Sequence, residues 1–122
     1  MATETRETAG LIGSDKVEGT NVYGTDREKI GSIERVMINK KSGEVAYAVL
    51  SFGGFLGMGD DHYPIPWQQL TYDTGLEGYR TDLTKEQLEG APKYSGRDDW
   101  NWDDRRQGRQ VYEYYGTPWV GY

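Results

Sequence analysis

Residues 29–52 read KIGSIERVMINKKSGEVAYAVLSF, and this stretch predicts a β-hairpin. Its first strand, residues 29–39, departs from strict alternation because Ile33 and Val36 lie three positions apart rather than two. An extra residue in a strand is typical of a β-bulge, which bends the strand and strengthens its twist. We therefore expect a bulge near Glu34–Arg35 and a curved sheet.

The turn and the returning strand of this hairpin complete the pattern. Residues 39–43 are polar, and Gly43 is suited to a positive φ in the turn. The returning strand, residues 44–52, is apolar on both faces, and a strand of this kind is central or covered on each side. Its two small residues, Ala46 and Ala48, leave room for the close packing of a small closed barrel.

Short strands and turns continue on both sides of the hairpin. We expect strands at 22–23, 62–67, 70–73 and 78–81, followed by one short helix at 82–88. Pro64 and Pro66 confine their strand to an edge of the sheet or to the rim of a barrel, since proline has no N–H to donate to a sheet. Thr84 and Gln87 have the spacing of a capping box at the start of the helix. The fold class predicted is all-β, a small antiparallel β-barrel.

Composition divides the 122 residues into three parts. All Leu, Ile, Val and Phe residues except Val111 and Val120 lie within 11–90, which predicts one small hydrophobic core. We expect a polar, flexible leader at 1–10, a single domain at 11–92 and a C-terminal extension at 93–122.

Several classes of function are disfavoured by composition. There is no cysteine, and the only histidine is His62, so we expect no disulfide, no thiolate chemistry, no metal site and no cofactor. The net charge of −6 repels phosphate backbones, so we do not expect nucleic acid as a partner. No apolar run is long enough to cross a membrane and no signal peptide is evident, which predicts a cytoplasmic protein without membrane insertion.

A glycine-rich loop follows the returning strand. Gly54 and Gly59 have the glycine spacing of a phosphate-binding loop, but Asp60 and Asp61 stand where that loop needs a cation. We instead expect four glycines to shape a tight loop at a corner of the barrel: Gly53, Gly54, Gly57 and Gly59.

The extension is poor in aliphatic residues but rich in aromatic ones, which disordered tails usually lack. With arginines between them, these aromatics predict either a surface for a partner or second copy, or packing against the chain's own barrel; the two are compatible. Stacking on single-stranded bases is a third interpretation, but four aspartates cancel the positive charge. The candidate contact residues are Trp100, Trp102, Tyr112, Tyr114, Tyr115 and Trp119.

The order and spacing of these segments resemble the PRC-barrel family. The resemblance rests on the hairpin at 29–52, on Gly53-Gly54-Phe55-Leu56-Gly57 and on Pro64-Ile65-Pro66-Trp67, and it covers roughly residues 11–81. That fold occurs in the cytoplasmic part of the photosynthetic reaction-centre H subunit and in the C-terminal domain of the ribosome-maturation factor RimM. The resemblance implies scaffolding or binding and no catalysis.

These observations together predict a non-catalytic, bacterial protein-interaction or assembly module of PRC-barrel type. We expect a protein partner or a homodimer formed through the extension. Two alternatives remain open from the sequence. The first is an accessory protein of RNA processing at the ribosome, and the second is a soluble regulator that contacts a membrane electron-transfer complex.

Overall fold

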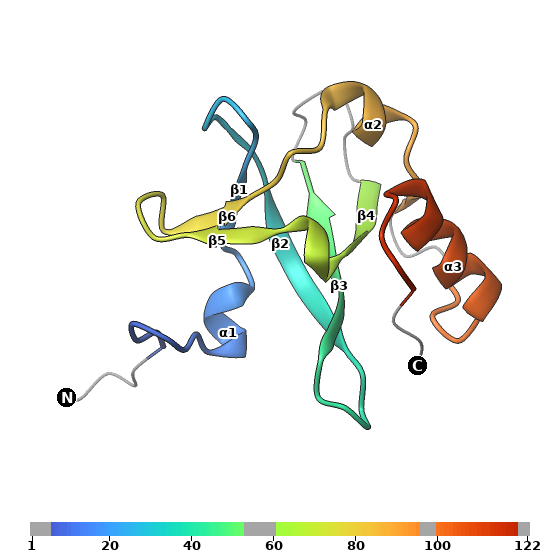
Figure 1. Cartoon of the computed structure of the whole chain (residues 1–122), viewed down its shortest axis with the longest axis horizontal. Coiled ribbons are helices and arrows are strands. Elements are labelled where there is room, and N and C mark those ends of the chain that lie inside the picture. Colours follow the sequence, from blue (N-terminus) through green and yellow to red (C-terminus); the bar gives the residue numbers. More distant parts are fainter. Residues whose placement is uncertain (1–5, 53–60, 96–99, 120–122) are drawn as a thin grey trace.

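The computed structural model describes residues 6–52, 61–95 and 100–119. Its elements, shown in Figure 1, follow one another in this order: α1 (Ser14–Val17), β1 (Asn21–Tyr23), β2 (Lys29–Ile38), β3 (Val45–Ser51), β4 (Asp61–Pro66), the 3-10 turn η2 (Trp67–Gln69), β5 (Thr71–Asp73), β6 (Gly78–Arg80), α2 (Lys85–Glu89), β7 (Tyr94–Ser95) and α3 (Arg105–Tyr114).

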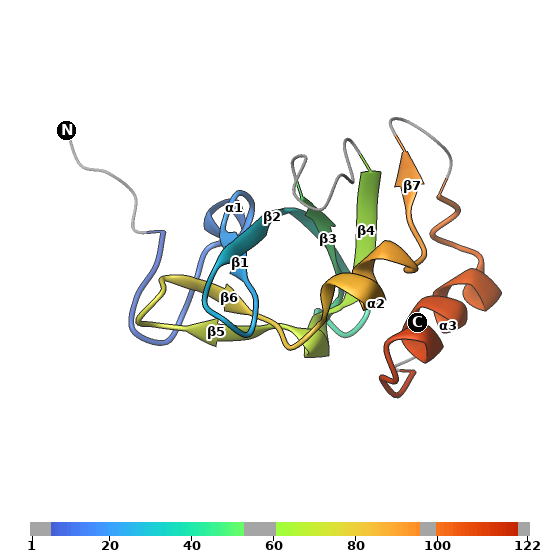
Figure 2. The same cartoon turned by 90° about the horizontal axis from the view of Figure 1, so that it is seen from above.

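The seven strands form one sheet in the order β5-β6-β1-β2-β3-β4-β7. Neighbouring strands are antiparallel except β1 and β6, which are parallel, so the prediction of a purely antiparallel sheet needs this correction. The sheet curls around the core (Figure 2), but within the described residues no hydrogen-bonded strand pair joins β4 to β5. Instead η2 and Leu70 connect these two strands, which makes the fold a small all-β barrel with an open seam.

The predicted bulge in β2 is confirmed. Ile33 pairs with Leu50 and Arg35 pairs with Val49, which leaves Glu34 as the extra residue. The turn of the hairpin is also as expected, with Gly43 at a φ of 78°.

Gly31 of β2 allows a close approach between β2 and the end of β3. A Cβ atom at this position would overlap the carbonyl oxygen of Ser51 and would lie 2.8 Å from Cδ1 of Phe52. Any larger residue therefore has to push the two strands apart.

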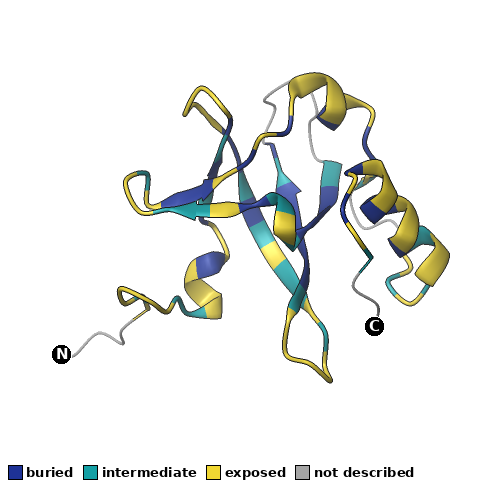
Figure 3. Ribbon diagram, in the orientation of Figure 1, coloured by how far each residue is buried: buried dark blue, intermediate teal, exposed yellow. Residues whose placement is uncertain are grey.

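Strand β3 is buried on both faces, as its composition predicts. Residues directly opposite each other in an antiparallel pair share a face of the sheet. The inner face, toward the core, therefore holds Ala48 and Leu50 of β3 together with their β4 partners Ile65 and Tyr63. On the outer face, the extension covers the part around Tyr47 and Val49 of β3, whereas Arg35 of β2 stays exposed (Figure 3).

Strand β4 pairs with β3 along the half that contains its two prolines. Pro64 pairs with Val49 and Pro66 with Tyr47, whereas β7 pairs only with Asp61 and His62 at the other end of β4. The proline-containing half of β4 is therefore an edge among the described strands, as predicted.

Helix α2 has the predicted capping box. The Thr84 hydroxyl accepts from the Gln87 N–H, and the Gln87 side chain accepts from the Thr84 N–H. The sequence did not predict the helices α1 and α3, the strand β7 or a short N-terminal hairpin. In this hairpin Glu7 and Ile12 form an antiparallel β-bridge.

Candidate functional site: the docked extension

The extension docks on an apolar strip of the outer face. Strand pairing places Tyr47 and Val49 of β3 on this face beside Met37 and Arg35 of β2. Tyr47 and Val49 are almost completely buried. A barrel without the extension would therefore expose this strip to water.

Helix α3 supplies the most deeply buried part of the contact. One side of the helix carries Gly108, Val111 and Tyr112, all buried, while its opposite side faces solvent (Figure 3). The Tyr112 ring meets the Tyr47 ring edge-on at a centroid distance of 5.4 Å, a favoured aromatic geometry. The Tyr112 hydroxyl donates a hydrogen bond of 2.6 Å to the carbonyl oxygen of Ala46.

Two indoles continue the contact beyond the start of α3. Trp102 packs edge-on against Tyr47 at 5.5 Å, and the guanidinium carbon of Arg35 lies 5.8 Å from the centre of its ring. This second distance is within the range of a cation–π interaction. The ring centroid of Trp100 lies 6.0 Å from that of Trp102 and 5.7 Å from that of Tyr94, so the rings form one cluster.

The bulge in β2 directs a second charged side chain to the same cluster. Nδ1 of His62 lies 2.7 Å and 2.8 Å from the two carboxylate oxygens of Glu34, and because a carboxylate accepts, Nδ1–H is the donor. The His62 ring in turn stacks on Tyr94 at 4.9 Å. Glu34 and Arg35 are adjacent in the bulge. Glu34 thus contacts the aromatic rings of the extension through His62, and Arg35 contacts them directly.

The segment after α3 returns to the open seam of the barrel. The Gln69 side-chain amide, in η2, donates to the Thr117 hydroxyl at 2.7 Å and to the Tyr115 carbonyl oxygen at 3.1 Å. Trp119 packs edge-on against Tyr112 at 5.1 Å. The extension therefore contacts β3, β4 and the connection that spans the seam.

The predicted contact residues fall into two groups. Tyr112 and Tyr115 are buried against the chain's own barrel. The other four keep exposed area: Trp100, Trp102 and Trp119 are half-buried and Tyr114 is exposed. The structure thus gives the extension the intramolecular packing that the sequence left as one of its compatible interpretations. The predicted loop glycines Gly53, Gly54, Gly57 and Gly59 lie outside the described residues.

Buried phenols are a further feature of the region where α3 meets the barrel. Among the described residues, the hydroxyls of Tyr63 and Tyr115 are buried without a hydrogen-bond partner. Burial raises the pKa of both phenols, because the charged phenolate would be poorly solvated there.

Sequence reasoning missed the residues that fix the extension to the sheet, namely Glu34, Arg35, His62 and Tyr94. The bulge was visible in the sequence, but the partners of its side chains depend on tertiary structure. The described part of the chain holds no group of three or more His, Asp or Glu residues that could bind a metal ion. It also contains no helix with the length and hydropathy needed to span a bilayer.

Comparison with known proteins agrees with this architecture. The family model of the PRC-barrel domain matches residues 10–88, and the chain belongs to this family. A search among curated proteins gave no match. The family match ends before β7 and α3, so the extension that covers the outer face lies beyond the part shared with the family model.

Proposed function

We propose that the protein is a non-catalytic interaction or assembly module, located in the cytoplasm, whose assembled form is a homodimer. Family membership supports the general class, since PRC-barrel domains are generally non-catalytic and bind other proteins. The extension supplies the proposed contact surface.

The proposal rests on how the indole rings of Trp100 and Trp102 are held by their neighbours. Trp100 and Trp102 are half-buried, so each ring is fixed by its neighbours while part of it stays accessible. Fixed, accessible aromatic side chains with arginine nearby are typical of the centres of protein interfaces. Their rigidity also reduces the entropy lost on binding.

The test is the concentration dependence of molecular mass, measured by analytical ultracentrifugation on the full chain up to about 1 mM. We expect a dimer that Trp100→Ala weakens. Trp67→Ala is the matched control, because it removes another half-buried indole, whose ring packs on Tyr79 of β6 and not on the rings of Trp100 and Trp102. A wild-type chain that is monomeric throughout this range would overturn the homodimer.

Removal of the whole extension is a poor test of binding. A chain ending at residue 92 would expose the strip around Tyr47, so it would lose binding and gain non-specific adhesion at the same time. Point substitutions at the accessible rings separate these two effects.

A further inference from the structure

Two aliphatic side chains, Leu11 and Ile38, are exposed to solvent, and the charged residues around them have opposite signs. Leu11 is 76% exposed and Ile38 is 51% exposed, and among the described residues only Tyr114 is a comparable exposed large hydrophobic side chain. Leu11 belongs to the N-terminal hairpin, residues 7–12, and Ile38 ends β2.

The patch around Ile38 is a groove of about 480 Å³ between the β2–β3 turn and the start of α3. Met37, Ile38 and Trp102 are among its apolar lining residues. Its charged residues are Lys40, Lys41, Arg105 and Asp103, an excess of two positive charges in a chain whose net charge is −6. None of the three cations has an ion-pair partner within the described ranges. We call this patch the basic groove.

The patch around Leu11 has the opposite sign. Leu11 lies beside a hollow of about 430 Å³ whose charged residues are Glu7 and Glu77, with no cation in its lining. In the part of the chain that the structure describes, neither carboxylate forms an ion pair. An exposed aliphatic side chain flanked by carboxylates is the chemical complement of the basic groove.

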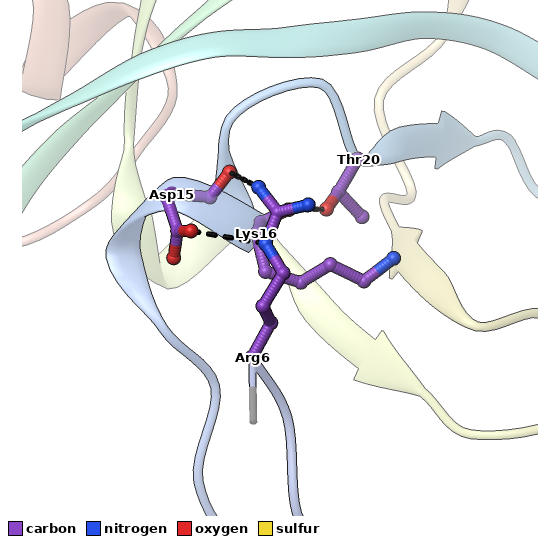
Figure 4. Close-up of polar contacts among 4 residues, drawn as sticks. All are labelled: Arg6, Asp15, Lys16 and Thr20. Atoms are coloured by element: carbon purple, nitrogen blue, oxygen red, sulfur yellow. Dashed lines mark hydrogen bonds and ion pairs between the residues drawn. The ribbon is translucent and has the colours of Figure 1, made fainter. Parts of the chain in front are cut away.

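The N-terminal hairpin is held in place before any partner arrives. The N–H of Thr8 donates to the carbonyl oxygen of Leu11 at 2.7 Å, and the N–H of Gly13 donates to that of Arg6 at 2.7 Å. Arg6 donates from Nε to the Asp15 carboxylate at 2.9 Å, which ties the hairpin to α1 (Figure 4). A preformed element loses less entropy on binding than a flexible one.

We propose that the N-terminal hairpin of one copy docks in the basic groove of a second copy, with Leu11 against Ile38 and Glu7 and Glu77 facing the lysines. The contact is between copies because the hairpin and α3 lie at opposite ends of the long axis (Figures 1 and 2). Two such contacts formed reciprocally close a dimer, and this inference rests on the proposed function of self-assembly.

The experiment uses ultracentrifugation of full chains carrying Leu11→Lys, which places a cation against the lysines of the basic groove, or Ile38→Asp, alone and mixed. Both side chains are exposed, so both variants are expected to fold, which near-ultraviolet circular dichroism checks. Gln68→Lys and Gln68→Asp are the matched controls, since Gln68 is exposed and lies in neither patch.

Each variant alone is expected to self-associate at least about tenfold more weakly than the wild type. An equimolar mixture is expected to recover association, because the Leu11→Lys chain keeps an intact groove and the Ile38→Asp chain keeps an intact hairpin. Association of the wild type is also expected to weaken with added salt.

Self-association that survives both substitutions, or that is lost in each variant without recovery on mixing, would overturn this docking mode and leave the proposed function standing. A wild-type chain that stays monomeric would overturn both. Lys41→Glu and Glu77→Lys give a second pair, for which the same recovery on mixing is expected.

Discussion

The phenol of Tyr112 donates to the carbonyl oxygen of Ala46 across 66 positions of sequence, and this bond joins α3 to strand β3 of the barrel. The donor is 1% exposed and the acceptor 6%. The extension is thus part of the hydrophobic core, and its removal or loosening affects the stability of the whole domain.

The Tyr112 hydrogen bond can be separated from the packing of its ring. Tyr112→Phe is expected to lower the free energy of unfolding by about 1 kcal/mol, because the Ala46 carbonyl loses its buried donor. Tyr112→Ala also removes the ring and is expected to cost about 3–5 kcal/mol. Urea denaturation measures both. Tyr114→Phe is the control, since the exposed Tyr114 hydroxyl donates to Gln87, and a change of less than about 0.5 kcal/mol is expected.

Truncation after Pro92 is expected to destabilise the barrel. Val111 and Tyr112 are buried, and burial of each such side chain contributes roughly 1.5–3 kcal/mol. The shortened chain is therefore expected to lose at least about 3 kcal/mol and to bind a hydrophobic dye through the exposed Tyr47 strip. Thermal denaturation with dye fluorescence measures both effects, and an unchanged transition would contradict the packing role of α3.

Gly31→Ala is expected to destabilise the fold by about 1–3 kcal/mol, because the new methyl group has to displace β3 backbone and Phe52. Gly10→Ala is the matched control, since a Cβ there meets nothing within 4 Å. Equal effects of the two substitutions, measured by chemical denaturation, would show that close strand approach is not the cause.

Alkaline pH is expected to unfold the protein through its tyrosines. The hydrogen bond from Tyr72 to the Glu7 carboxylate raises the pKa of Tyr72 from 10.0 to about 12. Since this folded-state pKa lies above the unfolded value, the resulting stability is complete below pH 10 and is lost between pH 10 and about 12. Burial shifts the pKa values of Tyr63, Tyr79 and Tyr115 in the same direction.

Ultraviolet absorbance of phenolate, recorded against pH, checks this expectation. Glu7→Gln is expected to move one late-titrating tyrosine toward pH 10 and to make the alkaline loss of stability shallower. Glu28→Gln, an exposed glutamate elsewhere, is the control. If the two variants titrate alike, the Glu7 hydrogen bond is not the cause.

Local signals made the hairpin, the bulge and the α2 cap predictable. Each depends on residues close in sequence: the spacing of Ile33 and Val36, the turn glycine Gly43, and the pair Thr84 and Gln87. The parallel pairing of β1 with β6 joins residues far apart in sequence and has no comparable local signal.

Helix α3 had signals that the sequence interpretation overlooked. Asp104 caps its first turn by accepting from the N–H groups of Arg106 and Gln107. At its end, Gly116 has a φ of 64° and its N–H donates to the carbonyl oxygen of Glu113. The N–H of Thr117 donates to the carbonyl oxygen of Tyr112, and these two bonds together form a Schellman motif. The buried positions 108, 111, 112 and 115 have helical spacing, but a glycine and two tyrosines hid the apolar stripe.

The distribution of indoles has a spectroscopic consequence. Three of the four tryptophans, Trp100, Trp102 and Trp119, lie in the extension, and only Trp67 belongs to the barrel. Intrinsic emission therefore reports mainly on the extension, with tyrosines 47, 94 and 112 close enough to transfer excitation energy to it. Undocking of the extension can be followed in real time without an attached label, separately from unfolding of the strands.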